Sequence, residues 1–411
     1  KGELIKLMKQ HVKDLQVEGK RVLVRCDFNV PLKDGAIRDD NRIVAALPTI
    51  KELISKGAKV ILMSHLGKID YKKTPEEIEA LKKKNNMAPI AVRLGELLGK
   101  EVKFCPVTRG EQLTSMVDSL NNGDVLVVQN TRYEKGESKN DPELSKIWAS
   151  LADAFVMDAF GSAHRAHCST YGVPELLKAE GKPTAVGYLV EKEVVSLGKV
   201  VNPTDRPYLA ILGGLKVSDK IKVIDSLLKK CDKVIICGAM SYTFLKALGH
   251  TVGTSPVEDN QVDYARKCLE EGHGKILLPV DIIVSDDFDN ANLIQTIDGL
   301  DVPDGFMGMD IGPKTRVLFH DEIQKANTIF WNGPAGVFEK EEYQAGTISV
   351  CKAIAENDHC FSVIGGGDSA AAAKQFGYKD SFSHVSTGGG ASLEMIENDG
   401  HLPGIDVIED K

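Results

Sequence analysis

The stretch LAILGGLKVSDKI (209–221) places two lysines, Lys216 and Lys220, directly after an apolar run and a glycine pair. Its spacing differs from the G-x-x-x-x-G-K-[ST] of a P-loop. If a helix starts near Ser218 or Asp219, both cations oppose the positive end of its dipole, at a cost of ~0.3–1 kcal/mol per charge. A bound polyanion would make the same arrangement favourable. The stretch therefore predicts a phosphate site, with two solvated lysines on a surface helix as the alternative.

Three further glycine-rich loops follow apolar runs in the same half of the chain. They are WNGPAGVFE (331–339), GGGDSAAAAKQFG (365–377) and STGGGASLEMI (386–396). Asn332, Glu339 and Asp368 add polar groups to them, and Asp368 could cap a helix or meet a metal. One such loop is weak evidence, but four at strand ends are typical of a nucleotide site. Magnesium is expected with the phosphates, because it prefers oxygen ligands and needs few protein carboxylates.

The first half of the chain carries a different set of polar residues. In RCDFNVP (25–31), Asp27 and Asn29 lie on the same side of an extended chain, because side chains alternate with period two. An Asx turn is the alternative interpretation of this pair. Arginine suits carboxylate and phosphate, since its planar fork donates two parallel hydrogen bonds. An anion pocket is predicted from these residues and from four cations near strand ends: Arg42, Lys68, Arg132 and Arg165.

The segment GSAHRAHCS (161–169) allows a second interpretation. His164 and His167 are three residues apart and Cys168 follows, so zinc is a possible ligand. Arg165 between the histidines would repel a metal, and no HExxH motif is present. We therefore favour an anion between two imidazoles, and keep zinc as the minor alternative. No Ser or Cys lies in a G-x-S-x-G elbow.

The elements that must position these residues alternate between short β-branched runs and amphipathic helical segments. Apolar runs that ignore period two predict strands buried on both faces, hence parallel sheets covered by helices. Ligands of such sheets sit outside the carboxyl ends of the strands, where the polar residues lie. The predicted strands are 22–28, 59–64, 124–130 and 154–160 in the first half, and 208–214, 233–238, 328–333, 361–367 and 382–390 in the second.

The length of the chain and one helix-breaking segment predict two domains. A chain of 411 residues is long for one core. GYLVEKEVVSLGKVV has helical spacing and is followed by NPTDRP before a new strand. The predicted division is 1–186, a linker helix over 187–204, and 205–395. The last residues, HLPGIDVIED, show no helical pattern and are expected to be a tail.

The bulk composition is that of an ordinary globular protein, with 42% hydrophobic and 27% charged residues. A net charge of −8 argues against nucleic acid or an anionic membrane as partner. The eight cysteines include no CxxC pair and predict buried thiols in a reducing compartment. No apolar run approaches the ~20 residues that span a bilayer. The first residues are too polar for a signal peptide, so a cytoplasmic location is expected.

Taken together, these motifs resemble the phosphoglycerate kinase family. RCDFNVP, DDNRI, MSHLG, DAFGSAHRAH, ILGGLKVSDKI, WNGPAGVFE, GGGD and VSTGGGASLE occur in the same order across essentially the whole chain. The resemblance implies two Rossmann-like α/β domains joined by a helix. The first would bind 3-phosphoglycerate or 1,3-bisphosphoglycerate and the second MgADP or MgATP. A C-terminal tail (396–411) would pack back toward the first domain, and the protein would be a monomer.

The resemblance also implies roles for single residues. The phosphoglycerate pocket would comprise Asp27, Asn29, Arg42, His65, Lys68, Arg132, His164, Arg165 and His167. Catalytic roles would fall to Arg42, Lys216 and Lys220, with Asp368 at the metal. The nucleotide site would comprise Gly213, Gly214, Lys216, Lys220, Gly238, Gly308, Asn332, Pro334, Val337, Glu339, Gly365, Gly366, Gly367, Asp368 and Ser369. Gly388, Gly389 and Gly390 would form a transition-state loop.

Three features of the sequence depart from the family pattern. Lys68 and Ile69 stand where the family usually has arginine and proline, and lysine lacks the bidentate fork. The segment 69–89 is longer and more charged than expected, and we interpret it as a surface insertion. Leu215 stands where a small residue is common.

The expected reaction is direct, in-line phosphoryl transfer between an acyl phosphate and ADP, reversible and without a covalent intermediate. Such transfers depend on positioning and charge neutralisation. Because the cations lie on separate domains, the domains are expected to close. A dinucleotide-dependent dehydrogenase is a rival hypothesis, but it needs a G-x-G-x-x-G motif that is not found. A non-catalytic nucleotide sensor is a second rival, and it leaves the first-half residues unexplained.

Overall fold

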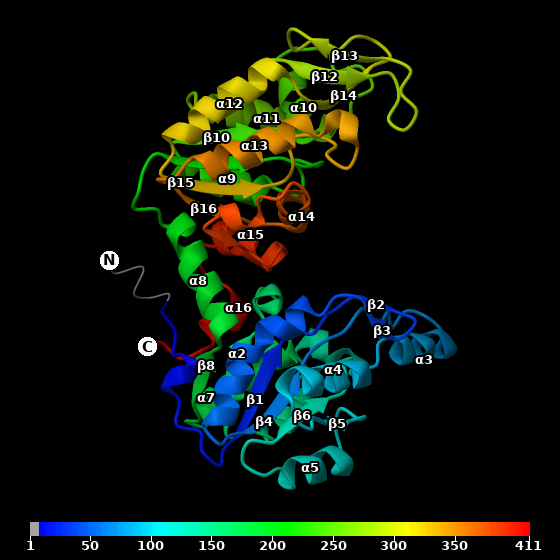
Figure 1. Ribbon diagram of the computed structural model, residues 1–411, viewed down its shortest axis with the longest axis vertical. Coiled ribbons are helices and arrows are strands. Elements are labelled where there is room, and N and C mark those ends of the chain that lie inside the picture. Colours follow the sequence, from blue (N-terminus) through cyan, green and yellow to red (C-terminus); the bar gives the residue numbers. More distant parts are fainter. Residues whose placement is uncertain (1–7) are drawn as a thin grey trace. The chain divides into compact units, whose positions relative to one another are not determined.

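The computed structural model describes residues 8–411. The chain divides into two compact units, drawn in Figure 1. Unit 1 contains the described residues up to Val195 together with His401–Lys411, and unit 2 contains Ser196–Gly400. The division falls inside helix α8 (Tyr188–Val201), which the sequence predicts as the linker. The domain boundaries and their separate functions stay predictions.

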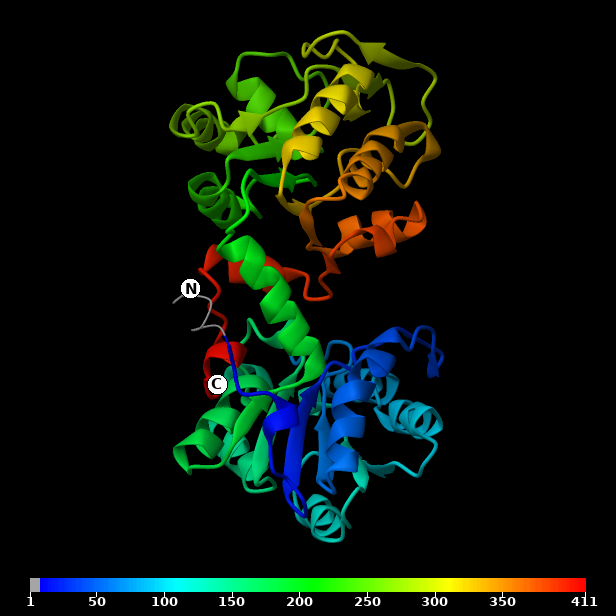
Figure 2. The ribbon, with the colours of Figure 1, turned by 60° about the vertical axis from the view of Figure 1, so that its left-hand side comes forward.

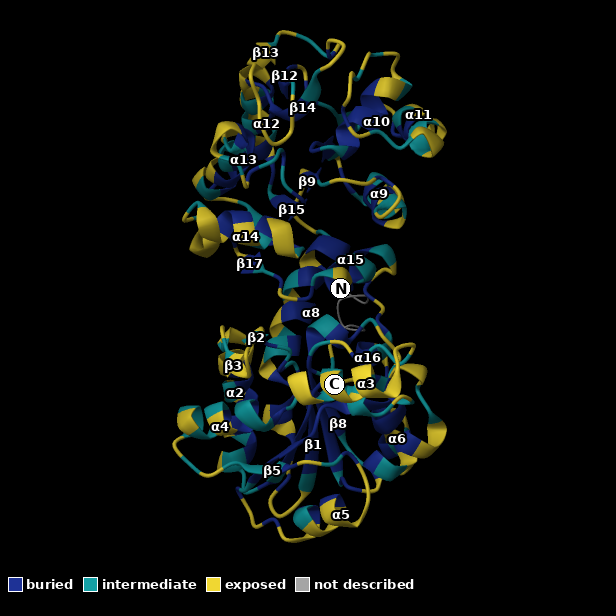
Figure 3. Cartoon of the chain, turned by 90° about the vertical axis from the view of Figure 1, so that its right-hand side faces the viewer, coloured by how far each residue is buried: buried dark blue, intermediate teal, exposed yellow. Residues whose placement is uncertain are grey.

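Unit 1 is built on a six-stranded parallel sheet in the order β5-β6-β4-β1-β7-β8. In register, Val24 of the central strand pairs with Leu62 on one side and Val156 on the other. These strands are buried on both faces, as Figure 3 shows for β1 and β8. The strands are β1 (Arg21–Cys26), β4 (Lys59–Met63), β5 (Lys103–Cys105), β6 (Val125–Val128), β7 (Ala154–Asp158) and β8 (Thr184–Val186).

Helices cover both faces of this sheet. The pair α2–α4 packs on one side and the pair α6–α7 on the other (Figure 2). Helix α3 has no buried residue, but Ile69 and Met87, within the predicted surface insertion 69–89, are buried. The helices are α2 (Asn41–Ser55), α3 (Pro75–Lys84), α4 (Ala88–Leu98), α5 (Glu111–Asp118), α6 (Pro142–Ala149) and α7 (Val173–Ala179), and a hairpin joins β2 (Leu32–Lys33) to β3 (Ala36–Ile37).

Unit 2 repeats the design with a second parallel sheet, in the order β11-β10-β9-β15-β16-β17. Two doubly wound parallel sheets were predicted, and the fold class is confirmed. The predicted strand at 382–390 is mostly wrong, because only His384 and Val385 pair. The strands are β9 (Tyr208–Leu212), β10 (Lys233–Ile236), β11 (Ile276–Leu277), β15 (Thr328–Asn332), β16 (Phe361–Ile364) and β17 (His384–Val385).

A small antiparallel sheet in unit 2 was not predicted. It has the order β13-β12-β14 and comprises β12 (Ile282–Ser285), β13 (Ile294–Ile297) and β14 (Met307–Ile311). Strand β13 is largely exposed and lacks an apolar run, whereas β12 and β14 are mostly buried and were missed as well. The helices of the unit are α9 (Ile221–Lys230), α10 (Met240–Ala247), α11 (Val262–Glu271), α12 (Pro313–Lys325), α13 (Ala345–Glu356), α14 (Gly367–Gln375) and α15 (Gly390–Glu397).

The C-terminal segment packs on unit 1. Contrary to expectation it contains a short helix, α16 (Pro403–Asp406). The Gly404 amide donates to the Ala163 carbonyl at 2.8 Å, and the Glu409 amide donates to the Thr184 hydroxyl at 3.0 Å. Lys9 pairs with Asp410 at 2.7 Å. The Lys9–Asp410 pair joins the first described residues to the C-terminal segment within unit 1.

All eight cysteines are free thiols, and seven of them are buried. Across residues 8–411, none of the helices combines the length and apolar character required to cross a membrane.

Candidate functional site

Unit 2 has a pocket of about 290 Å³ at the carboxyl ends of β9, β15 and β16. The polypeptide turns away from the sheet there in glycine-rich loops, so the backbone leaves room for a ligand. The lining residues are Gly214, Leu215, Lys216, Asp219, Lys220, Asn332, Gly333, Pro334, Gly366, Gly367, Asp368, Ser369 and Leu393. Both lysines of the opening motif therefore lie at one pocket with the loop around Asp368.

Lys220 is the buried cation of this pocket. Its ammonium group donates to the carbonyl of Gly213, and burial lowers the pKa of Lys220 to about 8. Asp368 and Cys237 oppose this shift only in part. Lys216, by contrast, is exposed. Helix α9 begins at Ile221, later than the expected Ser218 or Asp219, so Lys220 is its N-cap and points back to the strand end.

Asn332 and Gly366 determine the shape of the opposite wall. The Asn332 amide donates to the Gly365 carbonyl at 2.6 Å, while its oxygen is buried without a partner among the described residues. Gly366 has a φ of +103°, and a Cβ there would lie 2.4 Å from the Asn332 nitrogen. The Ser369 hydroxyl accepts from the Gly333 amide at 2.6 Å. These contacts position the start of α14, with Asp368 in its first turn, at the pocket.

The residues present fit a magnesium ion that arrives with a polyphosphate. Asp368 and Asp219 are the carboxylates at the pocket, and no group of three potential protein ligands occurs in the described part of the chain. Magnesium commonly takes one or two carboxylates, with phosphate oxygens and waters as its other ligands. The unpartnered Asn332 oxygen adds one more acceptor.

A cluster of polar side chains lies at the carboxyl ends of β1 and β4 in unit 1. Arg42, the second residue of α2, donates from Nη1 to the Asn29 carbonyl at 2.7 Å and to Asp27 Oδ1 at 3.3 Å. The Asn29 side chain accepts from the Gly67 amide at 2.8 Å. The Asx turn is also present, since the Asn29 amide donates to Asp27 Oδ1 at 3.2 Å. Asp27 and Asn29 thus hold Arg42 while leaving most of its fork available.

His65 and Arg132 extend the cluster. Burial lowers the pKa of His65 well below its usual value, and the nearby charges of Arg25, Arg132 and Arg42 lower it further. His65 is therefore neutral at pH 7. Arg132 donates to the Gly67 carbonyl at 2.7 Å. The three guanidinium groups around this neutral imidazole supply positive charge and N–H donors, and they therefore favour a bound anion.

The histidines near Cys168 do not form a zinc site. The Cys168 thiol donates to the carbonyls of Gly136 and Asp141 at 3.4 Å, so it serves the backbone. Burial lowers the pKa of His167, and Glu137 opposes that shift. Arg165 is exposed. The zinc alternative has no support among residues 8–411.

With both sites described, comparison with known proteins becomes informative. The family model for phosphoglycerate kinase matches residues 12–399. The chain belongs to the phosphoglycerate kinase family. It is 52% identical over 409 residues to the phosphoglycerate kinase of Enterococcus faecalis, covering 98% of this chain and 100% of that protein. It is also 52% identical over 412 residues to that of Clostridium novyi, with coverage of 99% and 100%.

Solved structures of the phosphoglycerate kinase family have the same fold. That from Coxiella burnetii has a TM-score of 0.87 at 37% identity, covering 97% of this chain and 98% of that one. That from Pyrococcus horikoshii has a TM-score of 0.79 at 32% identity, with the same coverage. The chain is therefore an enzyme of a family whose reaction is phosphoryl transfer.

The pocket in unit 2 brings together only part of the nucleotide residues expected from the phosphoglycerate kinase family. Nine of them line it: Gly214, Lys216, Lys220, Asn332, Pro334, Gly366, Gly367, Asp368 and Ser369. Two others, Gly213 and Gly238, allow the loops to pack closely together. A Cβ at Gly213 would lie 2.1 Å from the Pro334 carbonyl oxygen, and a Cβ at Gly238 would lie 2.6 Å from the Gly214 nitrogen. The remaining nucleotide residues, Gly308, Val337, Glu339 and Gly365, do not line the pocket, and neither do Gly388, Gly389 and Gly390 of the predicted transition-state loop.

Some residues of the two sites were missed or misjudged from the sequence. Leu393 of α15 lines the pocket, although only the glycines before it were singled out. Leu215, whose effect could not be inferred, also lines it and is 60% exposed. In unit 1, Lys68 is exposed, and among residues 8–411 its side chain makes no hydrogen bond or ion pair with the Arg42 cluster.

Arg25 is the main omission in unit 1. It is buried, donates from Nη2 to His65 Nδ1 at 2.9 Å and from Nε to the Ser169 hydroxyl at 2.8 Å. Ser169 in turn donates to the buried Glu137 at 2.8 Å. Arg25 lies in RCDFNVP, within the predicted strand 22–28, but only Asp27 and Asn29 of this motif were singled out. Ser169, whose hydroxyl accepts from Arg25, lies 144 residues away in the sequence, so no local signal could reveal this contact.

Replacing Gly366 with alanine is expected to weaken ADP binding at least ~10-fold, because the new Cβ must push Asn332 away from the pocket wall. The positive φ adds a stability cost of ~1 kcal/mol. Gly377→Ala is the matched control, since Gly377 has a φ of +81° with open space around it. Calorimetric titration with ADP measures the difference. Equal affinities of the two variants would contradict the role of the Gly366–Asn332 contact.

Proposed function

We propose that the protein catalyses reversible, magnesium-dependent transfer of the acyl phosphate of 1,3-bisphosphoglycerate to ADP, giving 3-phosphoglycerate and ATP. The observation that carries the proposal is the pocket of unit 2, where Lys216, Lys220 and Asp368 meet at glycine-rich strand ends. Two cations, together with the carboxylates of Asp368 and Asp219, suit a polyphosphate with its metal. Membership of the phosphoglycerate kinase family supports the same substrates.

The residues divide into two roles. We propose that the unit 1 cluster binds phosphoglycerate, with Asp27 and Asn29 orienting Arg42 and with His65 kept neutral. Further contacts with its phosphate and carboxylate would come from Arg132, His164, Arg165 and His167, with Lys68 as an additional cation. Lys216 and Lys220 would hold the transferring phosphate and the nucleotide phosphates.

The transfer step follows from charge neutralisation. The attacking ADP oxygen and the leaving carboxylate oxygen lie in line with the phosphorus, and no enzyme nucleophile takes part. Arg42 would neutralise the equatorial oxygens together with Lys216. Magnesium held by Asp368, when bound, would supply charge compensation on the nucleotide phosphates.

Closure of the two units is part of the proposal. Arg42 and Lys216 belong to different units, and both must reach one phosphoryl group during transfer. Closure would also exclude water, which otherwise accepts the phosphoryl group. We further propose that the protein acts as a monomer in the cytoplasm, in glycolysis and gluconeogenesis, as the family resemblance implies.

The test is an assay of ADP formation from MgATP with and without 3-phosphoglycerate. Strict dependence on both 3-phosphoglycerate and magnesium is expected. ATP binding without turnover stimulated by 3-phosphoglycerate would reject the proposed function.

A further inference from the structure

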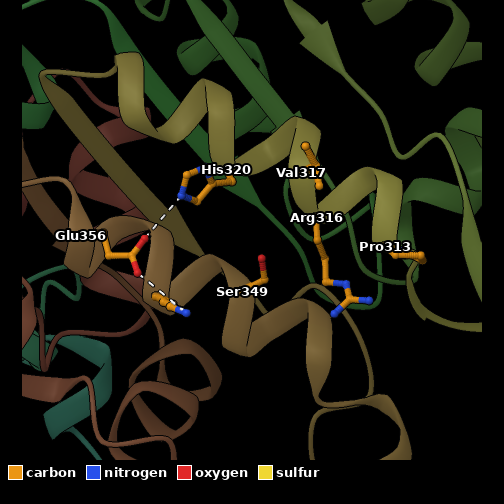
Figure 4. A pocket seen from close by; sticks show the side chains of 7 residues that line it. Pro313, Arg316, Val317, His320, Ser349 and Glu356 are labelled. Atoms are coloured by element: carbon orange, nitrogen blue, oxygen red, sulfur yellow. Dashed lines mark hydrogen bonds and ion pairs between the residues drawn. The ribbon is translucent and has the colours of Figure 1, made fainter.

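A second pocket in unit 2 lies between helices α12 and α13 and has a volume of about 330 Å³ (Figure 4). Arg316 and His320 come from α12, and Ser349, Lys352 and Glu356 come from α13. It shares no lining residue with the pocket that contains Lys216 and Lys220. The proposed phosphoryl transfer therefore leaves this groove, which we call the α12–α13 groove, without a role.

Arg316 is the feature that calls for a ligand. Its Nε is buried from solvent and meets no hydrogen-bond acceptor in the described chain. Arg316 as a whole is only partly buried and lines the groove, so its guanidinium fork supplies the donors that a ligand can reach. The neighbouring acid, Asp310, uses one oxygen to accept from the Gly346 amide at 2.8 Å. Figure 4 shows the Arg316 side chain descending from α12 toward α13.

The other side chains of the groove leave it positively charged. Glu356 is shared between Lys352 at 3.8 Å and His320 at 3.4 Å. Glu356 is the one carboxylate in the lining against Arg316 and Lys352, so the lining carries one excess positive charge, and Asp310, which interacts electrostatically with Arg316, lies outside it. Ser349 directs its hydroxyl into the groove from α13 (Figure 4). Such a positive groove is unusual on a protein of net charge −8.

The start of α12 contributes no free amides to this groove. The amides of Lys314 and Thr315 both donate to the Asp281 carboxylate at 2.9 Å. An anion in the groove must therefore be held by side chains. Arg316, Ser349 and Lys352 approach from two helices and offer two full charges and a hydroxyl donor, a set that suits a tetrahedral dianion better than a monovalent carboxylate.

We propose that the α12–α13 groove is a binding site for a phosphate group, either inorganic phosphate or a small phosphate monoester. Arg316 donates through the terminal nitrogens of its fork, Ser349 donates its hydroxyl, and Lys352 exchanges its long contact with Glu356 for the ligand. The pocket volume exceeds that of phosphate alone and leaves space for the body of a monoester.

The test is residue-resolved NMR of the full chain, titrated with inorganic phosphate, glycerol 3-phosphate or acetate at constant ionic strength. The backbone amides of Val317, Ser349 and Lys352 report on the groove separately from the other pocket. Saturable shifts with phosphate or with glycerol 3-phosphate are expected, and the tighter of the two identifies the source of the phosphate group. An equal response to acetate would overturn the assignment.

Substitutions decide whether the side chains hold the ligand. Arg316→Gln is expected to weaken phosphate binding at least ~10-fold. Lys352→Gln, at an exposed position, provides a second variant in which the fold is not at risk. Arg266→Gln is the control, because Arg266 is an exposed arginine on α11, paired with Asp263, away from the groove. Unchanged groove shifts in both groove variants, or phosphate shifts confined to residues 213–220 and 365–369, would overturn the proposal.

Discussion

Replacing Arg42 with alanine is expected to lower kcat at least ~10²-fold, the usual loss when a preoriented charge is removed from a transition state. Arg42 is held by the Asn29 carbonyl and by Asp27, so its guanidinium is oriented before substrate binds. Its side chain is 45% exposed, which leaves its remaining donors free for a phosphoryl group. KM for MgATP should change little, because the proposed nucleotide site lies in unit 2.

Two further variants sharpen this prediction. Arg42→Lys keeps the charge but loses the planar fork, so an intermediate loss of about 10-fold in kcat is expected. Arg38→Ala removes an exposed arginine close by in sequence and should leave kcat unchanged. Steady-state kinetics with saturating MgATP and 3-phosphoglycerate measures all three. Near-normal turnover of Arg42→Ala would reject its catalytic role.

Removal of Lys220 should have the second large effect, an increase of about 10²-fold in the Kd for ADP. Its lowered pKa makes the affinity of the unmodified protein depend on pH. Below pH 8 the free protein already carries the ammonium charge, so Lys220 adds no pH dependence there. Above pH 8 the free lysine is neutral and must take up a proton when phosphate binds. The Kd should therefore rise by up to about tenfold per pH unit.

Calorimetric titration with ADP between pH 6 and 10 tests this. In Lys220→Ala the rise above pH 8 should disappear together with most of the affinity. Lys222→Ala is the matched control, because Lys222 is an exposed lysine on the same helix. If the Kd for ADP of Lys220→Ala rose by the same factor above pH 8, a group other than Lys220 would be responsible for the pH dependence.

Local patterns predicted the longer strands of the parallel sheets but missed the short β5, β8 and β11, which have only two or three residues each. Strands such as β1, β4, β9 and β15 are buried on both faces, and their continuous apolar runs made them visible. Strand β13 is exposed and carries no such run, so it was missed. The predicted strand at 382–390 failed for another reason, because its glycines lead into α15 rather than extend the pairing of β17.

The sites show the same contrast. Glycine-rich loops beside Lys216, Lys220 and Asp368 were found because close approach to phosphate needs residues without side chains. The contacts that join these loops were not predictable, since Gly366 meets Asn332 only when β15 and β16 lie side by side. Likewise, the contribution of Leu393 depends on where α15 packs.

The sequence by itself determined the fold class, the family and which residues could meet a phosphate, because burial patterns and glycine spacing act over a few residues. Only the tertiary structure decided that Lys220 bonds to Gly213 and has a lowered pKa, and that Arg25 holds His65. It also decided that Arg316 lies in a groove with a buried, unpartnered nitrogen. Desolvation depends on everything packed around a charge, and those neighbours come from distant parts of the chain.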